Sequence, residues 1–209
     1  MGLTAQHRQM DIDEPRLIDR SRHGDLDSFN RLVELYQRQV YNLCLRMLAV
    51  PQAAEDAAQE AFIHAYRSLA SFRGGSFRAW LLRIAANACY DELRRRRARP
   101  ALSLDAPTPA GGHPPDIPHP GPSLDDHAQR LELARCLQDA LAALPPDQRL
   151  AVILCDVQGL PYEEIAQATG TSLGTVKSRI SRARARLRAL LLARGELLPA
   201  PFRPSSEGP

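Results

Sequence analysis

The sequence has few aromatic residues and no pattern typical of β-strands. Aromatic residues make up only 5% of its 209 positions, and no sustained alternation rich in Val, Ile and Thr occurs. Leu, Ala, Arg and Glu dominate instead, and these residue types favour helices. Because 44% of the residues are hydrophobic, the chain can form packed cores. The sequence therefore predicts an all-α fold.

Motifs for catalysis and metal binding are also absent. The six histidines form no ligand pattern, and neither a phosphate-binding P-loop nor a nucleophile elbow occurs. The cysteines are widely spaced with no Cys-x-x-Cys pair, which predicts reduced thiols that are mostly core residues on helices. They are Cys44, Cys89, Cys136 and Cys155. We expect no enzyme activity, no metal and no cofactor.

No apolar run approaches the length that crosses a bilayer, and the N-terminus lacks the apolar core of a signal peptide. We therefore expect a cytoplasmic protein without membrane insertion. The formal net charge of +3 is small, but the basic residues are strongly clustered. Clustering matters more than total charge for binding a polyanion.

A proline-rich segment divides the chain. Residues 100–124 contain eight prolines and three glycines but no Lys or Arg. This composition cannot continue a helix and buries little surface, so we predict a linker at 100–125. The linker separates an N-terminal helical domain at 14–99 from a C-terminal one at 126–194. Residues 195–209 are expected to form a disordered tail.

The C-terminal domain carries the pattern of a helix-turn-helix. Residues 160–176 read as a helix, a turn at Gly170 and the start of a second helix, and six basic but no acidic residues follow between Lys177 and Arg188. Gly170 can take a positive φ, and Thr171 or Ser172 can cap the second helix.

The second helix separates into two faces when it advances about 100° per residue. One face is an apolar stripe that can pack on the preceding helix. The stripe comprises Val176, Ile180, Ala183 and Leu187. The opposite face offers Ser178, Ser181 and Arg182 to base edges, with basic flanks toward phosphates. A solvated basic helix is the alternative interpretation.

The N-terminal domain is expected to be a helical bundle with helices near 25–48, 52–69 and 77–97. In the third helix, Trp80, Ile84 and Ala88 are expected to point inward. The same helix ends in five arginines within residues 94–99, more than the helix dipole requires. Together with the basic helix of the C-terminal domain, the chain thus presents two separate cationic surfaces joined by a flexible arm, which suggests two contacts on one nucleic acid.

The middle helix of this bundle has a polar, acidic ridge formed by Asp56, Gln59 and Glu60. Spacing alone favours a solvated face for these residues. If the ridge binds a partner, that partner is a protein rather than DNA, because like charges repel.

Longer motifs carry a resemblance to a known family. Ala54-Glu-Asp-Ala-Ala-Gln-Glu-Ala-Phe-Ile and Phe77-Arg-Ala-Trp-Leu-Leu-Arg-Ile-Ala-Ala-Asn resemble the promoter-melting domain of the small extracytoplasmic-function (ECF) bacterial sigma factors. Leu160-Pro-Tyr-Glu-Glu-Ile-Ala and Gly174-Thr-Val-Lys-Ser-Arg-Ile-Ser-Arg are similar to their second DNA-binding domain. Both domains occur in the family's order.

The resemblance implies a role for each surface. The acidic ridge would dock on the clamp helices of the largest subunit of core RNA polymerase. Asn87 and the loop at 73–77 would read the minus-10 element as a melted strand, around a flipped base, and nearby arginines would hold phosphates. These arginines are Arg94, Arg95, Arg96 and Arg97. The residues that would bind the minus-35 element as duplex DNA are Lys177, Ser178, Ser181, Arg182 and Arg184.

The resemblance also implies a monomer that associates with the nucleoid when active and is controlled by an anti-sigma factor. A different class of function stays open, namely a helix-turn-helix repressor or activator that acts alone as a dimer. Such a protein needs a dimerisation surface, and the sequence shows neither a sustained heptad nor a spare amphipathic helix. A third possibility is a protein that sequesters polymerase or another factor.

Overall fold

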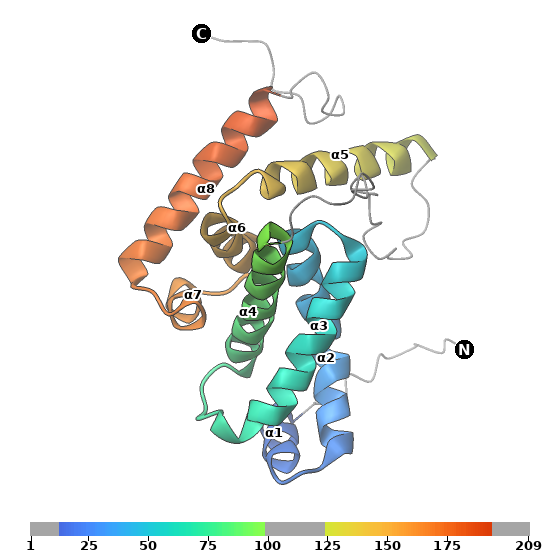
Figure 1. The fold of residues 1–209 in the computed structure, drawn as a ribbon, viewed down its shortest axis with the longest axis vertical. Helices are drawn as coiled ribbons and strands as arrows, with labels where there is room; N and C mark the ends of the chain where they lie inside the picture. The colour runs from blue at the N-terminus through green and yellow to red at the C-terminus, as the bar shows by residue number, and fades with distance from the viewer. Residues whose placement is uncertain (1–12, 99–123, 194–209) are drawn as a thin grey trace, which may run out of the picture.

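The regular secondary structure of the described residues is all helical, which confirms the predicted fold class. The computed structural model describes residues 13–98 and 124–193, and within these ranges it contains no strand (Figure 1). Nearly all of the predicted linker and the whole predicted tail at 195–209 lie outside the described residues. The predicted domain boundaries stay a prediction.

The N-terminal helices form a bundle in which α2, α3 and α4 lie side by side, with α1 across one end (Figure 1). Their bounds are α1 Glu14–Arg22, α2 Leu26–Leu48, α3 Pro51–Ser68 and α4 Phe77–Ala98, with a 3₁₀ turn, η1, at Leu69–Ser71. Asp25 begins α2 by accepting hydrogen bonds from the backbone N–H groups of Asp27 and Ser28, at 3.1 and 3.4 Å. The three helices predicted from periodicity are confirmed.

The core of this bundle combines large side chains from α2 with small ones from α3. Leu32, Val40, Leu43 and Met47 of α2 are almost completely buried. The buried residues of α3 are all alanines: Ala54, Ala57, Ala58, Ala61 and Ala65. Small side chains let neighbouring helices approach closely, so α3 fits against the bulky face of α2.

In α4 the inward face differs in part from the expected one. Ala88 is buried as predicted, but Trp80 and Ile84 are only half-buried, whereas Leu81 and Leu82 are buried. The reason is that α4 packs against α2 and α3 and also against α7 of the C-terminal domain. A helix with neighbours on several sides buries a wide face. A single apolar stripe at three and four residue steps therefore does not predict all of its buried residues.

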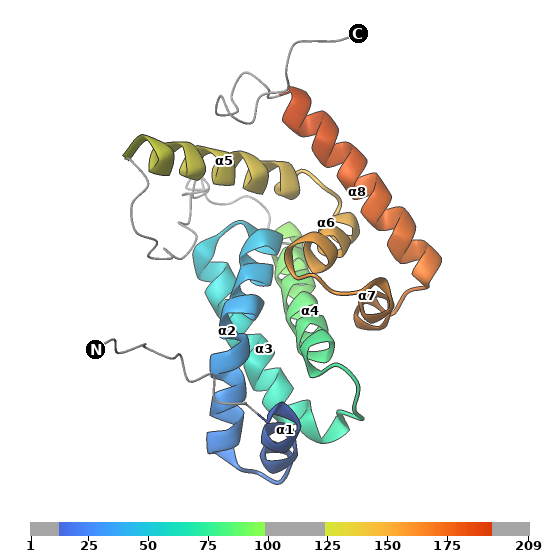
Figure 2. The ribbon, with the colours of Figure 1, turned by 180° about the vertical axis from the view of Figure 1, so that it is seen from behind.

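The C-terminal domain consists of α5 Leu124–Ala142, α6 Pro146–Val152, α7 Tyr162–Thr169 and α8 Leu173–Ala193, with a π-helical turn, η2, at Ile153–Val157. Helix α8 packs across α5, α6 and α7. The two domains also touch each other, because α4 contacts α7 while α2 contacts α5, α6 and η2 (Figures 1 and 2). The C-terminal domain therefore rests against one side of the N-terminal bundle.

Candidate nucleic-acid interface

The turn between α7 and α8 has the geometry that its sequence predicts. Helix α7 ends at Gly170, whose φ of 63° is left-handed and favours glycine. Ser172 then accepts a hydrogen bond from the backbone N–H of Thr175 at 3.2 Å, so it caps the start of α8. The predicted turn residue and the Ser172 cap are both confirmed.

Helix α8 buries the predicted apolar stripe. Val176 and Ile180 are 1% exposed, Ala183 is fully buried and Leu187 is half-buried. Ile165 of α7, the helix that packs against α8, is fully buried too. On the remaining surface of α8, Lys177, Ser181, Arg182 and Arg184 are exposed and Ser178 is half-buried. One face of α8 thus holds the domain together while the other is exposed to solvent.

Arg182 is held in place by its own helix. Its Nε donates to the backbone oxygen of Ser178 at 3.1 Å, and its Nη2 donates to Ser178 Oγ at 2.9 Å. A guanidinium has five N–H donors, so three remain for a ligand. Because the side chain is already ordered, less rotamer freedom is lost when it binds.

Two other arginines of α8 are paired with acids of the same domain, which the sequence did not predict. Arg184 forms a two-pronged contact with Asp156 on η2, with Nε–Oδ2 at 3.1 Å and Nη2–Oδ1 at 2.5 Å. Arg179 Nε lies 3.0 Å from Asp147 Oδ2 on α6. The hydrogen bonds from Arg184 lower the pKa of Asp156 below its ordinary value. These pairs orient α8 on its domain.

The second cationic surface lies at the end of α4. Arg94, Arg95 and Arg97 are exposed there and Arg96 is half-buried, whereas Asn87 is exposed in the middle of the same helix. Arg94 pairs with Asp91. Glu92 pairs with both Arg95 and Arg96, at 3.1 and 2.7 Å. The spacing of three and four residues explains these pairs, since such residues are neighbours on a helix.

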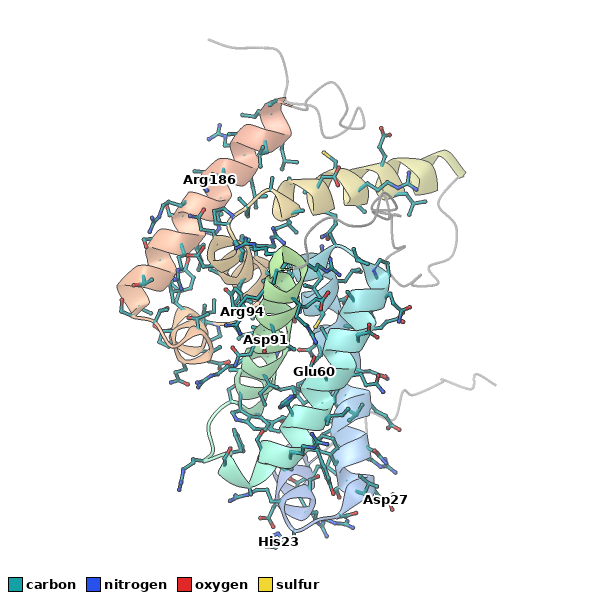
Figure 3. The ribbon with its side chains drawn as sticks, viewed as in Figure 1. His23, Asp27, Glu60, Asp91, Arg94 and Arg186 are labelled. Carbon is teal, nitrogen blue, oxygen red and sulfur yellow. The ribbon has the colours of Figure 1, made fainter. Side chains whose placement is uncertain are left out.

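The predicted acidic ridge lies on α3 beside this arginine cluster. Asp56 and Gln59 are exposed, and Glu60 is partly exposed. Glu60 Oε2 lies 3.5 Å from Arg95 Nη2 on α4, so the two surfaces meet; Figure 3 shows Glu60 near Asp91 and Arg94. The structure thus brings together residues that were predicted to bind two different partners.

The loop before α4 is flanked by aromatic side chains that pack against each other. Gly74 and Gly75 have φ of 92° and 87°, which lets the chain turn sharply. Phe72 packs edge-on against Phe77 with ring centroids 5.5 Å apart. Ser76 Oγ caps α4 by accepting from the N–H of Ala79 at 3.2 Å. The loop at 73–77 is therefore fixed at both ends.

Three cysteines are buried as expected, and Cys155 is half-buried. A hydrogen bond with Cys44, together with burial, raises the pKa of Cys89, which makes it a poor nucleophile. Within residues 13–98 and 124–193, no three His, Cys, Asp or Glu side chains gather as a metal site would need. The helices in this part of the chain are also too short or too polar to span a bilayer.

The fold and these surfaces define a two-domain helical DNA-binding protein of the helix-turn-helix class. Two family models match the chain: "Sigma-70 region 2" over residues 32–99 and "Sigma-70, region 4" over residues 134–187. The first match covers α3, α4 and most of α2, and the second covers the helix-turn-helix.

Curated relatives and a solved structure agree with these matches. The ECF RNA polymerase sigma factor SigM of Mycobacterium tuberculosis is 35% identical over 192 residues, which cover 91% of this chain and 89% of SigM. SigE of Mycolicibacterium smegmatis, also named an ECF RNA polymerase sigma factor, is 40% identical over 167 residues, 79% of this chain and 62% of SigE. The sigma factor RpoE of Bartonella quintana, solved with the anti-sigma factor NepR, superposes with a TM-score of 0.60 at 29% identity over 78% of this chain and 96% of RpoE.

The chain belongs to the ECF RNA polymerase sigma factors. It is thus a transcription initiation factor that directs RNA polymerase to promoters, and the stand-alone repressor or activator is not favoured.

Proposed function

We propose that the two cationic surfaces bind two different elements of the same promoter. The observation that carries this proposal is helix α8, which buries one face and exposes the other directly after the Gly170 turn. An exposed helical face of this kind fits the major groove, where paired bases can be distinguished. Lys177, Ser178, Ser181 and Arg182 therefore contact the minus-35 element as duplex, and Arg184 contributes from the flank.

Helix α4 and the loop before it read the minus-10 element after the strands separate. Asn87 is exposed and the loop at 73–77 is fixed on aromatic rings, so both offer a rigid surface to an unstacked base. Arg94, Arg95, Arg96 and Arg97 hold the neighbouring phosphates. Since exposed ion pairs contribute little free energy, phosphates can replace Asp91 and Glu92 as their partners.

The ridge of Asp56, Gln59 and Glu60 docks on the clamp helices of the largest polymerase subunit. All three side chains reach solvent on α3, which packs mainly against α2 and α4. We also propose an anti-sigma factor as a partner, because the similar RpoE was solved with one. The chain then works as a monomer on the nucleoid in the bacterial cytoplasm and has no enzyme activity of its own.

The test is transcription from a library of randomised promoters by purified core RNA polymerase, with and without this protein. We expect starts that depend on the protein and share a motif of two separated parts. Glu60→Lys should abolish these starts, while Glu34→Lys, the same change on the exposed side of α2, should not. An absence of starts, together with tight DNA binding by the protein alone, would contradict the proposal.

A further inference from the structure

Gly174 is the second residue of α8, at a position where the backbone does not require a glycine. The other five glycines in the described ranges have a positive φ, which few other residue types adopt. Gly174 does not have a positive φ. In a helix, glycine loses more conformational freedom on folding than alanine does, so it lowers the stability of the helix. The local backbone therefore does not explain the glycine at position 174.

Packing does not explain this glycine either. A β-carbon built at Gly174 would meet Ser172 Oγ at 3.9 Å, which is an ordinary van der Waals contact. Apart from its chain neighbours and the backbone of α8, no other atom of the described residues lies within 4 Å of that β-carbon. The Ser172 hydroxyl is held by Thr175, 3.2 Å from its N–H and 2.9 Å from its Oγ1. An alanine side chain thus fits the free protein without any movement of its neighbours.

Gly174 lies on the face of α8 that is proposed to contact the minus-35 element. The residue is exposed, and a helix turns about 100° per residue, so Gly174 lies about 160° away from the buried Val176. Ser178 and Ser181 follow four and seven residues later and share this face. The face toward the DNA therefore begins with small residues.

A helix fits the major groove with little room to spare. An α-helix with its side chains is about 10–12 Å across, and the groove is about 12 Å wide. In helix-turn-helix proteins the N-terminal residues of the second helix contact base edges. A residue without a side chain in the first turn lets the backbone of α8 approach the bases more closely than any other residue does.

The depth of this first turn in the groove determines where the guanidinium of Arg182 lies. Arg182 folds back along the helix, since its Nε and Nη2 donate to Ser178 at 3.1 and 2.9 Å. Ser178 is only about 6 Å from Gly174 along the helix axis, at 1.5 Å per residue. The guanidinium of Arg182 is thus bonded to a residue one turn from Gly174. A side chain at position 174 that meets the DNA would hold this guanidinium away from the base edges.

We propose that Gly174 is a positioning residue for minus-35 recognition. The absence of a side chain lets the first turn of α8 enter the major groove far enough for Arg182 to reach a base edge. This inference rests on the proposed function, because it requires α8 to lie in the groove of the minus-35 element. It also explains the presence of a residue that lowers the stability of the free protein, since the benefit of the glycine arises only in the complex with DNA.

The test uses Gly174→Ala and Gly174→Leu, because alanine and leucine both favour helices more than glycine does. Thermal unfolding of the free chain is measured first. We expect the melting temperature of Gly174→Ala to rise by about 1–4 °C, since the helix becomes more stable and no neighbour clashes. A lower melting temperature would show that the fold itself needs the glycine, and it would overturn the inference.

Competition between minus-35 duplexes for the protein bound to core polymerase then measures recognition. We expect Gly174→Ala to weaken binding about tenfold and Gly174→Leu to weaken it more. Both should lose the preference at the base pair whose preference Arg182→Ala also loses. Because both changes then remove the same contact, the double variant Gly174→Leu/Arg182→Ala should discriminate no worse than Gly174→Leu alone. Additive losses would show that the two residues act independently, and they would refute the positioning role.

Ala189→Leu is the matched control. Ala189 is also exposed on α8 but lies about 22 Å further along the helix axis. We expect this variant to bind and rank the duplexes as the wild type does, and an equal loss in the control would overturn the role of position 174. If the wild type ranks the duplexes and the Gly174 variants bind them with the same affinities, this inference alone fails. A wild type that does not distinguish minus-35 sequences would overturn the proposed function as well.

Discussion

Arg182→Ala tests the proposed minus-35 surface most directly. In the structure, two of the five N–H donors of Arg182 go to Ser178, which leaves three for a base edge. A bidentate contact with the correct base is worth about 1–3 kcal/mol of discrimination, or about 5- to 150-fold in relative affinity. The variant should lose that preference at one position of the minus-35 element.

A phosphate contact predicts a different result. Loss of one such contact weakens binding to all sequences alike and lowers the salt slope by about 0.9. Arg186→Ala is the matched comparison, because Arg186 is exposed on the outer side of α8 (Figure 3). We expect Arg186→Ala to weaken binding to all sequences alike and to lower the salt slope. We expect Arg182→Ala to lose the preference for one base at one position of the minus-35 element.

The assay is competition between minus-35 duplexes for holoenzyme, with each base pair changed in turn and the salt concentration varied. The reasoning is refuted if Arg182→Ala ranks the duplexes in the same order and with the same ratios as the wild type. In that case Arg182 contributes only charge, and the ordered side chain over Ser178 has no part in reading sequence.

Three further changes test other parts of the molecule. Glu60→Lys should weaken binding to core polymerase, since it reverses a charge on the ridge, and unaltered affinity in a titration would remove Glu60 from the docking surface. Asn87→Ala should reduce open-complex formation, measured by permanganate reactivity, more than it reduces duplex binding, and equal losses would contradict a role after melting. Hydrogen bonds from Arg184 lower the pKa of Asp156, so this pair stabilises the fold above the ordinary pKa of about 3.9 and its contribution is lost as pH falls through the lower, folded value. In urea unfolding from pH 6 to pH 2, Asp156→Asn should therefore lose stability less steeply than the wild type, and identical slopes would exclude this contribution.

Much of the fold could be predicted because its helices have strong periodic patterns. Helix α2 repeats large apolar residues at three and four residue steps, from Phe29 to Met47, and nearly all of them are buried. The two faces of α8 were predictable for the same reason. Helix α1 has no such pattern, since most of its residues are polar. A hydrogen bond from Tyr36 to Glu14, at 2.9 Å, ties it to α2.

The contact between the domains could not be predicted from the sequence. Gln138, Arg149 and Gln158 are polar residues on helices or in a turn, and periodicity places such residues at the surface. Arg149 and Gln158 are buried and Gln138 is half-buried. All three donate to carbonyl groups of α2 that are about 90 to 120 residues away along the chain. Backbone acceptors occur in every sequence and leave no pattern of their own, so only the structure shows which ones are used.

The acidic partners of the arginines change how the basic clusters should be understood. Arg94, Arg95 and Arg96 are paired with Asp91 or Glu92, and Arg184 is paired with Asp156. When a phosphate replaces one carboxylate, the free energy gained on DNA binding is only the difference between the two ion pairs. This difference is small for exposed groups. The number of basic residues therefore overstates how strongly the free protein binds DNA. We therefore expect the protein alone to bind promoter DNA weakly and to recognise a promoter only together with polymerase.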